Sequence, residues 1–285
     1  MPLQLNRRVR RMNMARLMAP RWQVSVVALG LLAGCVSVQS VPPAARSDLT
    51  ATGKLRVGLI LSNPVLVTKD PQTGELRGVT IALGKALAKR LGVPFEPVGY
   101  PNPAALVQSV GRNEWDIAFL AFDPARARDV EFSPPYMVVD NTYLVLSGSK
   151  VESVEAADQR GVRIAVPERS APDLFFSRSL KAAEIVRVPG GADPAIEVLR
   201  SGRADAYAEN AHMLSLYSGR LPGSRVLPGR YTVVQHAVAT PKGRPAAAEF
   251  VKQFVEQSKR DGTVRDAMAK AGLRRTDVAP SALVK

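Results

Sequence analysis

The sequence predicts an α/β fold with two similar lobes, each built around a mainly parallel sheet. Strand patterns and helix patterns alternate along residues 55–120, and a second cycle of the same kind starts after residues 143–146. Of the 285 residues, 46% are hydrophobic, enough for one large domain or two lobes of roughly 100 to 150 residues each. Charged residues make up only 22%, and Gly and Pro are near average, so fibrous and disordered classes are excluded.

The first cycle begins with a compact apolar run at residues 55–60, which predicts a buried strand. Four apolar side chains then recur at every fourth position and form one face of a helix: Val79, Leu83, Leu87 and Leu91. Gly92 ends this helix. The remaining elements are, in order, strand 95–100, a helix from Pro103 to Gly111 and strand 116–120. This β-α-β-α-β order implies a mainly parallel sheet with helices on both faces.

The second cycle repeats the pattern and ends in two amphipathic helices. Its predicted elements are strands 143–146, 163–167, 185–188, 204–208 and 236–240, and helices 172–181 and 194–200. The two closing helices carry apolar side chains after Pro245 and around Val264.

The N-terminal region has the composition of an export signal. Six Arg and no acidic residue occur in residues 1–34, and the apolar run 22–33 is shorter than the ~20 residues that a membrane span needs. Residues 35–50 lack apolar periodicity and predict a flexible tether. The remaining excess of basic over acidic residues is spread along the chain, so we expect no nucleic-acid binding. The single Cys excludes a disulfide framework and a thiolate zinc site.

The apolar run ends in the sequence LAGC at residues 32–35, which resembles a bacterial lipoprotein signal. The resemblance implies cleavage after residue 34 and acylation of Cys35, by palmitate or similar chains. The folded part would then work in the periplasm, held at a membrane by its lipid. Val36, at the second mature position, favours the outer membrane over the inner membrane.

Seven segments from residue 53 onward resemble the bacterial extracellular solute-binding proteins of family 3. They are 53–58 (GKLRVG), 74–79 (GELRGV), 115–118 (WDIA), 126–136 (RARDVEFSPPY), 202–207 (GRADAY), 241–243 (PKG) and 260–263 (RDGT). The resemblance implies a two-lobed, periplasmic-binding-protein-like fold of type II with a ligand cleft between the lobes. Lobe 1 would comprise residues 51–138 plus 237–282 and lobe 2 residues 139–236, joined by crossing segments near 136–140 and 233–237.

The same resemblance implies a monomeric receptor that is not an enzyme and holds no cofactor or metal. It would capture a small carboxylate-bearing solute between its lobes and deliver it to the permease subunits of an ABC importer. Arg126 is the residue expected to bind the ligand carboxylate through two parallel hydrogen bonds, and Arg128 is the alternative. The other expected ligand-binding residues are Ala121, Phe122, Asp123, Ser170, Ala171 and Asn210.

Several of these positions depart from the family pattern. Asp123 is expected either to meet a ligand cation or to cap a turn, and Ser170 either to contact an anion or only to cap a helix. Asn210 occupies the place where the family carries an Asp for the ligand amine. Glu209 is adjacent, but in an extended strand it would point the other way. The ligand is therefore expected to be an amino acid, another small carboxylate or a different organic solute.

Two other functions compete with the receptor. Dehydratases that act on prephenate or arogenate share this fold and need a general acid or base, for which Glu168, Glu209 or Asp123 could serve. A ligand-sensing lipoprotein without a transporter is the third possibility. His212 and His236 are far apart in sequence and are expected to be structural.

Overall fold

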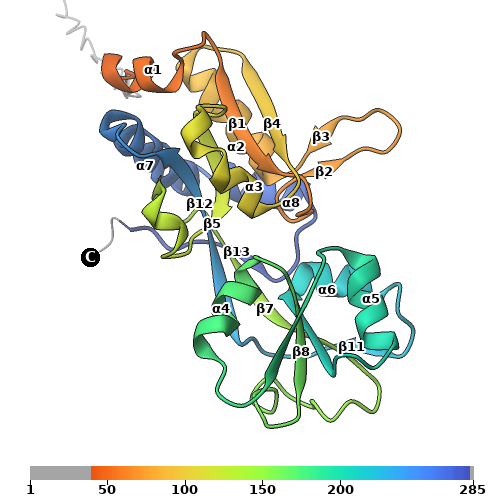
Figure 1. Cartoon of the computed structure of the whole chain (residues 1–285). Helices are drawn as coiled ribbons and strands as arrows, with labels where there is room; N and C mark the ends of the chain where they lie inside the picture. The colour runs from red at the N-terminus through yellow and green to blue at the C-terminus, as the bar shows by residue number, and fades with distance from the viewer. Residues whose placement is uncertain (1–39, 283–285) are drawn as a thin grey trace, which may run out of the picture. The chain divides into compact units, whose positions relative to one another are not determined.

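The computed structural model describes residues 40–282, which form two α/β lobes joined by long strands (Figure 1). The elements of lobe 1 are α1 (Pro43–Leu49), β1 (Leu55–Ile60), β2 (Thr68–Lys69), β3 (Leu76–Arg77), α2 (Val79–Leu91), β4 (Phe95–Tyr100), α3 (Pro103–Gln108), β5 (Ile117–Ala121), β6 (Val130–Phe132), α7 (Pro245–Arg260) and α8 (Thr263–Lys270). Those of lobe 2 are β8 (Arg163–Pro167), α4 (Ala171–Ser179), β9 (Glu184–Val188), α5 (Ala192–Arg200), β10 (Ala206–Asn210), α6 (Ala211–Ser218) and β11 (Ser224–Val226). The strands between the lobes are β7 (Met137–Leu146), β12 (Thr232–Pro241) and β13 (Thr276–Val278).

Each lobe contains the parallel sheet that its β-α-β pattern predicts. In lobe 1, β1 pairs in parallel with β4 and with β5. In lobe 2, β8 pairs in parallel with β9 and with β10. The strand order along the main path is β4-β1-β5-β12-β7-β10-β8-β9, so β12 and β7 join the two parallel groups. The predicted α/β fold class is confirmed.

The connection between the lobes is an antiparallel ribbon. Strands β7 and β12 pair from Thr232↔Asn141 to His236↔Met137, where the family resemblance implies crossing segments (Figure 1). Strand β13 pairs with the same part of β7. The C-terminal segment therefore adds a third strand to the connection.

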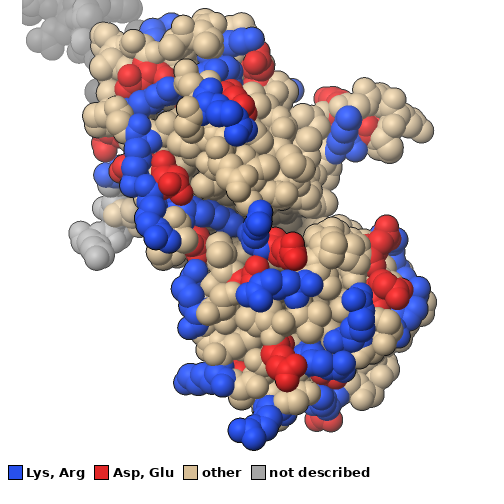
Figure 2. All heavy atoms as spheres, viewed as in Figure 1, with Lys and Arg blue, Asp and Glu red and all other residues tan. Residues whose placement is uncertain are grey.

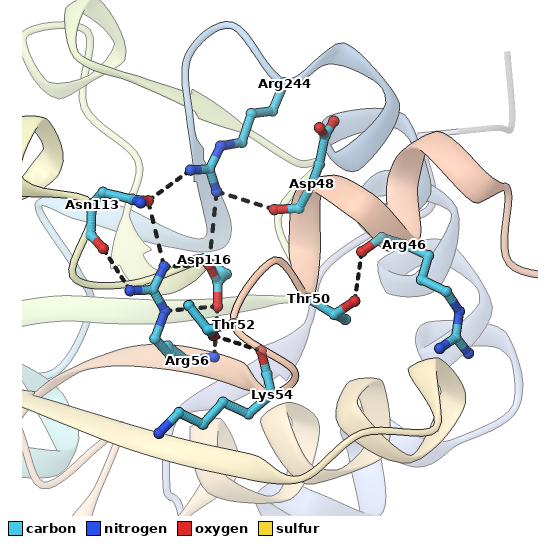
Figure 3. A network of polar contacts seen from close by, with 9 residues as sticks. All are labelled: Arg46, Asp48, Thr50, Thr52, Lys54, Arg56, Asn113, Asp116 and Arg244. Atoms are coloured by element: carbon cyan, nitrogen blue, oxygen red, sulfur yellow. Dashed lines mark hydrogen bonds and ion pairs between the residues drawn. The ribbon is translucent and has the colours of Figure 1, made fainter.

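A corresponding Arg–Asp ion pair occurs at the start of the first strand of each parallel group. In lobe 1, Arg56 donates from its backbone and its guanidinium to the fully buried carboxylate of Asp116, and Asn113 and Arg244 extend this network (Figure 3). In lobe 2, Arg163 contacts Asp205 in the same way. Each carboxylate thus joins the start of the first strand to the segment that leads into a neighbouring strand.

Residues 43–49 correct the prediction of a flexible tether through residue 50. They form helix α1, on which Ala45 and Leu49 are fully buried, four positions apart, against α7. The carbonyl of Asp48 accepts a hydrogen bond from Arg244, which ties the helix to the rest of lobe 1 (Figure 3). The tether prediction is therefore wrong for α1. The first residues of the predicted tether, 35–39, lie outside the described residues, and they include Cys35, the proposed site of lipid attachment.

Several element boundaries also differ from prediction. The strand expected at 143–146 is β7, which starts six residues earlier, at Met137. The helix expected to reach Gly111 ends at Gln108 and continues as a 3₁₀ turn. The strand expected at 204–208 is β10, two residues later, and the one expected at 236–240 starts at Thr232. The start of β12 is set by its pairing with β7, which local periodicity does not reveal.

Lys and Arg side chains are spread over both lobes, with acidic side chains among them (Figure 2). Within residues 40–282, no helix combines the length and the apolar character that crossing a bilayer requires. In the same part of the chain, no three His, Cys, Asp or Glu side chains gather in an arrangement that could hold a metal ion.

Candidate functional site

A cavity of about 380 Å³ lies at the carboxyl ends of the parallel strands of both lobes. Lobe 1 contributes residues just after β1, β4 and β5, and lobe 2 contributes residues just after β8 and β9 and at the end of β10. Asn141, Val234 and His236 of the connecting strands also line the cavity. Ligands of open α/β sheets bind at such strand ends. This cavity is therefore the candidate binding site.

Arg126 lies in this cavity with its side chain almost fully buried, at 7% exposure. Its Nη1 donates to the carbonyl of Ala121 (3.0 Å), and its Nη2 donates to the carbonyl of Arg169 in lobe 2 (3.3 Å). Burial lowers the pKa of Arg126 to about 10, Asp123 opposes this shift and Arg178 adds to it. The guanidinium therefore remains charged at neutral pH. Arg128, the rival residue, is exposed and does not line the cavity.

Of the three other ligand-binding residues predicted at the end of β5 and just after it, one lines the cavity and two do not. Ala121 lines the cavity. Phe122 is 47% exposed and packs edge-on against Phe132, with ring centroids 5.3 Å apart, so it does not line the cavity. Asp123 is also absent from the lining: one of its carboxylate oxygens caps the amide of Ala125 at 2.8 Å. Asp123 therefore caps a turn, one of its two expected roles.

Ser170 and Ala171 line the cavity at the start of helix α4. The Oγ of Ser170 accepts a hydrogen bond from the amide of Asp173 (3.3 Å), which is an N-cap interaction. Arg169, just before this cap, has a left-handed φ of 56° and directs its carbonyl to Arg126. The chain thus brings the helix start and the buried guanidinium together across the cleft.

Asn210 and Glu209 both line the cavity, at the end of β10. The Oδ1 of Asn210 caps helix α6 by accepting from the amide of Met213 (2.9 Å). The backbone N and the Nδ2 of Asn210 both donate to Oε1 of Glu209, at 2.8 and 3.0 Å. The expectation that Glu209 points away from the cleft is wrong, because the strand ends here and the carboxylate folds back onto Asn210.

Two polar residues of the connecting strands complete the lining. Asn141 is 1% exposed, and its Nδ2 donates to the Tyr231 hydroxyl at 3.2 Å, while its Oδ1 has no hydrogen-bond partner within the described part of the chain. His236 is 5% exposed, its Nδ1 likewise lacks a partner there, and burial together with Arg126 lowers its pKa to about 3. Sequence reasoning missed Asn141, and the signal available was a polar residue inside an apolar strand.

Of the remaining candidates, Glu168 lines the cavity at an exposed position. His212 does not line it, and its Nδ1 accepts from the amide of Arg274 at 3.3 Å. A carboxyl group available for acid–base chemistry is therefore present in the cleft at Glu168 and Glu209, and not at Asp123.

The chain is similar to several known solute-binding proteins. The chain is 24% identical over 251 residues to GlnH, the glutamine-binding protein of an ABC transporter of Bacillus subtilis (strain 168), covering 84% of this chain and 91% of GlnH. Among solved structures, a mutant of ArgBP from T. maritima matches with a TM-score of 0.67 and 23% identity, over 80% of this chain and 99% of that one.

AncCDT-1 is a further similar structure. It is described as an ancestral amino acid-binding protein and a precursor of cyclohexadienyl dehydratase, and it matches with a TM-score of 0.66 and 27% identity over 79% of this chain and 97% of its own. A second structure of AncCDT-1, described as an ancestral cationic amino acid solute binding protein, matches at 28% identity with a TM-score of 0.60, over 79% of this chain and 98% of that one.

The match to the family itself extends over residues 55–272, more than half of the chain. The relatives of known role are mainly substrate-binding proteins of amino-acid ABC transporters. The protein belongs to the bacterial extracellular solute-binding proteins, family 3.

Proposed function

We propose that this protein captures a small carboxylate-bearing solute between its two lobes and delivers it to the permease of an ABC importer. The observation that carries the proposal is Arg126, a buried guanidinium in the cleft for which the described residues provide no ion-pair partner. The nearby Asp123 is paired with Arg178 instead. A buried unpaired charge is costly, and a ligand carboxylate would compensate it with two parallel hydrogen bonds.

The cleft supplies a second set of donors on the opposite wall. Arg126 comes from lobe 1, whereas the start of α4 in lobe 2 offers the amide of Ala171 and the hydroxyl of Ser170 to an anionic group. The amides of Ser170 and Asp173 already donate to Pro167 and to the Ser170 Oγ. A solute held between these two walls would favour closure, since closure allows both lobes to contact it. The closed form would then be the one that docks on the permease.

The proposed location is the periplasm, with the receptor held at a membrane, favouring the outer membrane, through an acylated Cys35. Support comes from the sequence at residues 32–35 and from the basic, then apolar, segment before it. Replacing Cys35 with Ser should release the full-length protein from the membrane fraction of expressing bacteria. Mass spectrometry of the mature N-terminus would show an acyl chain on the wild-type protein only. An unmodified wild-type N-terminus would contradict the anchor.

The binding proposal is tested by a thermal-shift screen of residues 40–285 with amino acids, keto acids, dicarboxylates, aromatic acids, opines and prephenate. Ligand at ~100 times its dissociation constant adds about 2.7 kcal/mol of stability, which corresponds to several degrees. Arg126→Ala should weaken binding of any hit by about 10-fold to 100-fold, as expected for a charge-assisted pair. Arg128→Ala is the matched control, because Arg128 lies two residues away and is exposed. Equal affinity of wild type and Arg126→Ala would overturn the role of Arg126.

A dehydratase is a second candidate function, because a partly buried carboxyl group, Glu209, lies in the cleft and burial raises its pKa. The similarity to AncCDT-1 also favours this candidate. The screen includes its test. Prephenate that is consumed over time by the wild-type protein would indicate catalysis, whereas a stable shift without consumption would indicate a receptor.

A further inference from the structure

Two buried polar atoms of the connecting strands belong to cavity-lining residues and have no hydrogen-bond partner among residues 40–282. They are Oδ1 of Asn141 on β7 and Nδ1 of His236 on β12, and these two residues are only 1% and 5% exposed. The hydroxyls of Tyr136 and Tyr207 are also buried without a partner in this part of the chain, but neither tyrosine lines the cavity. Since buried polar groups are almost always hydrogen-bonded, the atoms of Asn141 and His236 are available to a bound molecule.

The pairing of the connecting strands places both residues on one face. Asn141 pairs with Thr232. His236 pairs with Met137, so Asn141 and His236 lie four positions apart along the two strands, which corresponds to about 13 Å. Opposite residues of an antiparallel pair share a face, as do alternate residues of one strand. Val234 lies between the two polar residues on this face and also lines the cavity. This face is the cavity floor, which is therefore polar at both ends and apolar in the middle.

The lobe 1 end of the cavity floor adjoins Arg126. His236 pairs with Ala121 of β5, and the carbonyl of Ala121 accepts the hydrogen bond from Nη1 of Arg126. Burial and the charge of Arg126 lower the pKa of His236 to about 3, so the imidazole is uncharged at neutral pH. A neutral imidazole has one donor nitrogen and one acceptor nitrogen. His236 is thus placed to donate to a carboxylate that Arg126 holds.

The lobe 2 end of the cavity floor is formed by Asn141. This residue pairs with Asn210 at the end of β10, and its Nδ2 donates to the Tyr231 hydroxyl at 3.2 Å. Glu209 also lines the cavity at the end of β10 and would repel a second carboxylate of a solute. A hydroxyl or a carboxamide suits Asn141, because each of these groups both donates and accepts hydrogen bonds and carries no charge.

We infer that the cavity floor is a subsite for an elongated solute, whose carboxylate binds Arg126 and His236 and whose far end carries a hydroxyl or a carboxamide that binds Asn141. The middle of the solute is apolar and lies over Val234. This inference rests on the proposed function, because it concerns the same cleft, and it names the class of carboxylate. It concerns the far end of the solute and holds with or without an amine beside the carboxylate. A compact acid such as lactate would not reach both ends of the floor.

The experiment compares solutes that share a carboxylate and differ only at the far end, where a methyl or isopropyl group replaces the polar group. The pairs without an amine are 5-hydroxypentanoate with hexanoate, and glutaramate with 5-methylhexanoate. The pairs with an amine are L-5-hydroxynorvaline with L-norleucine, and L-glutamine with L-homoleucine. Dissociation constants are measured by calorimetry for the wild type, Asn141→Leu, His236→Leu and Arg126→Ala. Tyr231→Phe is the matched control, because it removes the protein partner of Asn141 and leaves the unpaired atom in place.

The wild type should bind the polar member of a pair at least about tenfold more tightly than its apolar counterpart, which would leave Asn141 buried and unpaired. Asn141→Leu should remove this preference, and Tyr231→Phe should keep it within about threefold. His236→Leu should weaken both members of a pair by a similar factor, about tenfold, because His236 lies at the carboxylate end. Thermal unfolding of each free variant shows whether it is folded. The comparison within the wild type needs no variant and decides the inference even if Asn141→Leu does not fold.

Two results would overturn the inference and leave the proposed function in place. One is equal or reversed affinity within every pair in the wild type, which would show that water satisfies Asn141 in the bound state. The other is a preference for the polar member that Asn141→Leu retains. In both cases Arg126→Ala would still weaken binding. Failure of every carboxylate to bind the wild type, or unchanged affinity in Arg126→Ala, would instead overturn the proposed function.

Discussion

Asp123 of lobe 1 and Arg178 of lobe 2 form an ion pair across the cleft, with 2.9 Å between Oδ2 and Nη2. Asp123 is 5% exposed, whereas the Arg178 side chain remains half exposed. Near it, Arg126 donates across the cleft to the carbonyl of Arg169. These two contacts join the loop after β5 to the start and the end of helix α4, and both must break when the lobes separate.

The ion pair between Asp123 and Arg178 should favour the closed form modestly. Asp123→Asn keeps the oxygen that caps Ala125 and removes the charge, and Arg178→Gln removes its partner. Each change should weaken ligand binding by less than about fivefold, because Arg178 is solvent-exposed. The radius of gyration of the ligand-free protein, measured by X-ray scattering, should increase. Arg187→Gln is the control, since Arg187 pairs with Asp173 within lobe 2. If the effects of Asp123→Asn and Arg178→Gln on ligand affinity are fully additive in a double-mutant cycle, the two side chains do not interact energetically, and the prediction is contradicted.

The two ion pairs at the strand starts should differ in their contribution to stability. Asp116 is fully buried and Arg56 nearly so, whereas Asp205 and Arg163 are more exposed. Asp116→Ala should therefore lower the free energy of unfolding by about 3 to 5 kcal/mol, because it leaves the Arg56 charge uncompensated. Asp205→Ala should lower it by about 1 kcal/mol. Urea unfolding at neutral pH measures both values, and an equal loss would show that burial does not decide the contribution.

His236 should make the protein sensitive to mild acid. Its folded-state pKa of about 3 lies below its ordinary value of 6.5, because burial and Arg126 disfavour the charged imidazole. The unfolded chain therefore takes up the proton first as the pH falls, and stability decreases between about pH 6.5 and 3 by up to about 1.4 kcal/mol per pH unit. His236→Gln should reduce the slope of unfolding free energy against pH in this window by about that amount. Parallel profiles for the two proteins would contradict the assignment.

Helix α1 should contribute to the stability of lobe 1. Leu49→Ala should lower the free energy of unfolding by about 2 to 5 kcal/mol, since the leucine is fully buried. Ser47→Ala, at an exposed position of the same helix, should change it by less than about 0.5 kcal/mol. Thermal and urea unfolding of residues 40–285 measure both effects. If Leu49→Ala proves as stable as Ser47→Ala, residues 43–49 behave in solution as the tether that the sequence predicts.

Much of the fold could be predicted because it depends on local patterns. The apolar runs of β1 and β5 and the four-residue spacing on α2 are properties of short segments, and they lead directly to parallel β-α-β units. The starts of α3 at Pro103 and of α4 within one residue of Pro172 could be predicted for the same reason, since capping residues act within one turn. The packing of α1 against α7 could not be predicted. A segment of seven residues with two buried side chains shows too little periodicity to indicate a partner helix about 200 residues away in the chain.

The residues of the candidate site also fall into those that local sequence motifs predict and those that depend on tertiary structure. Arg126, Ser170 and Asn210 could be named from their positions in family motifs, and all three line the cavity. The direction of Glu209 and the burial of Asn141 and His236 could not, because both depend on where β10 ends and on how β7 pairs with β12. Sequence by itself determined the alternation of strands and helices, the family, and Arg126 as the cationic side chain of the cleft. Only the tertiary structure decided that the Glu209 carboxylate also lies in this cleft, since the environment of a side chain depends on segments that are distant in the chain and meet only after folding.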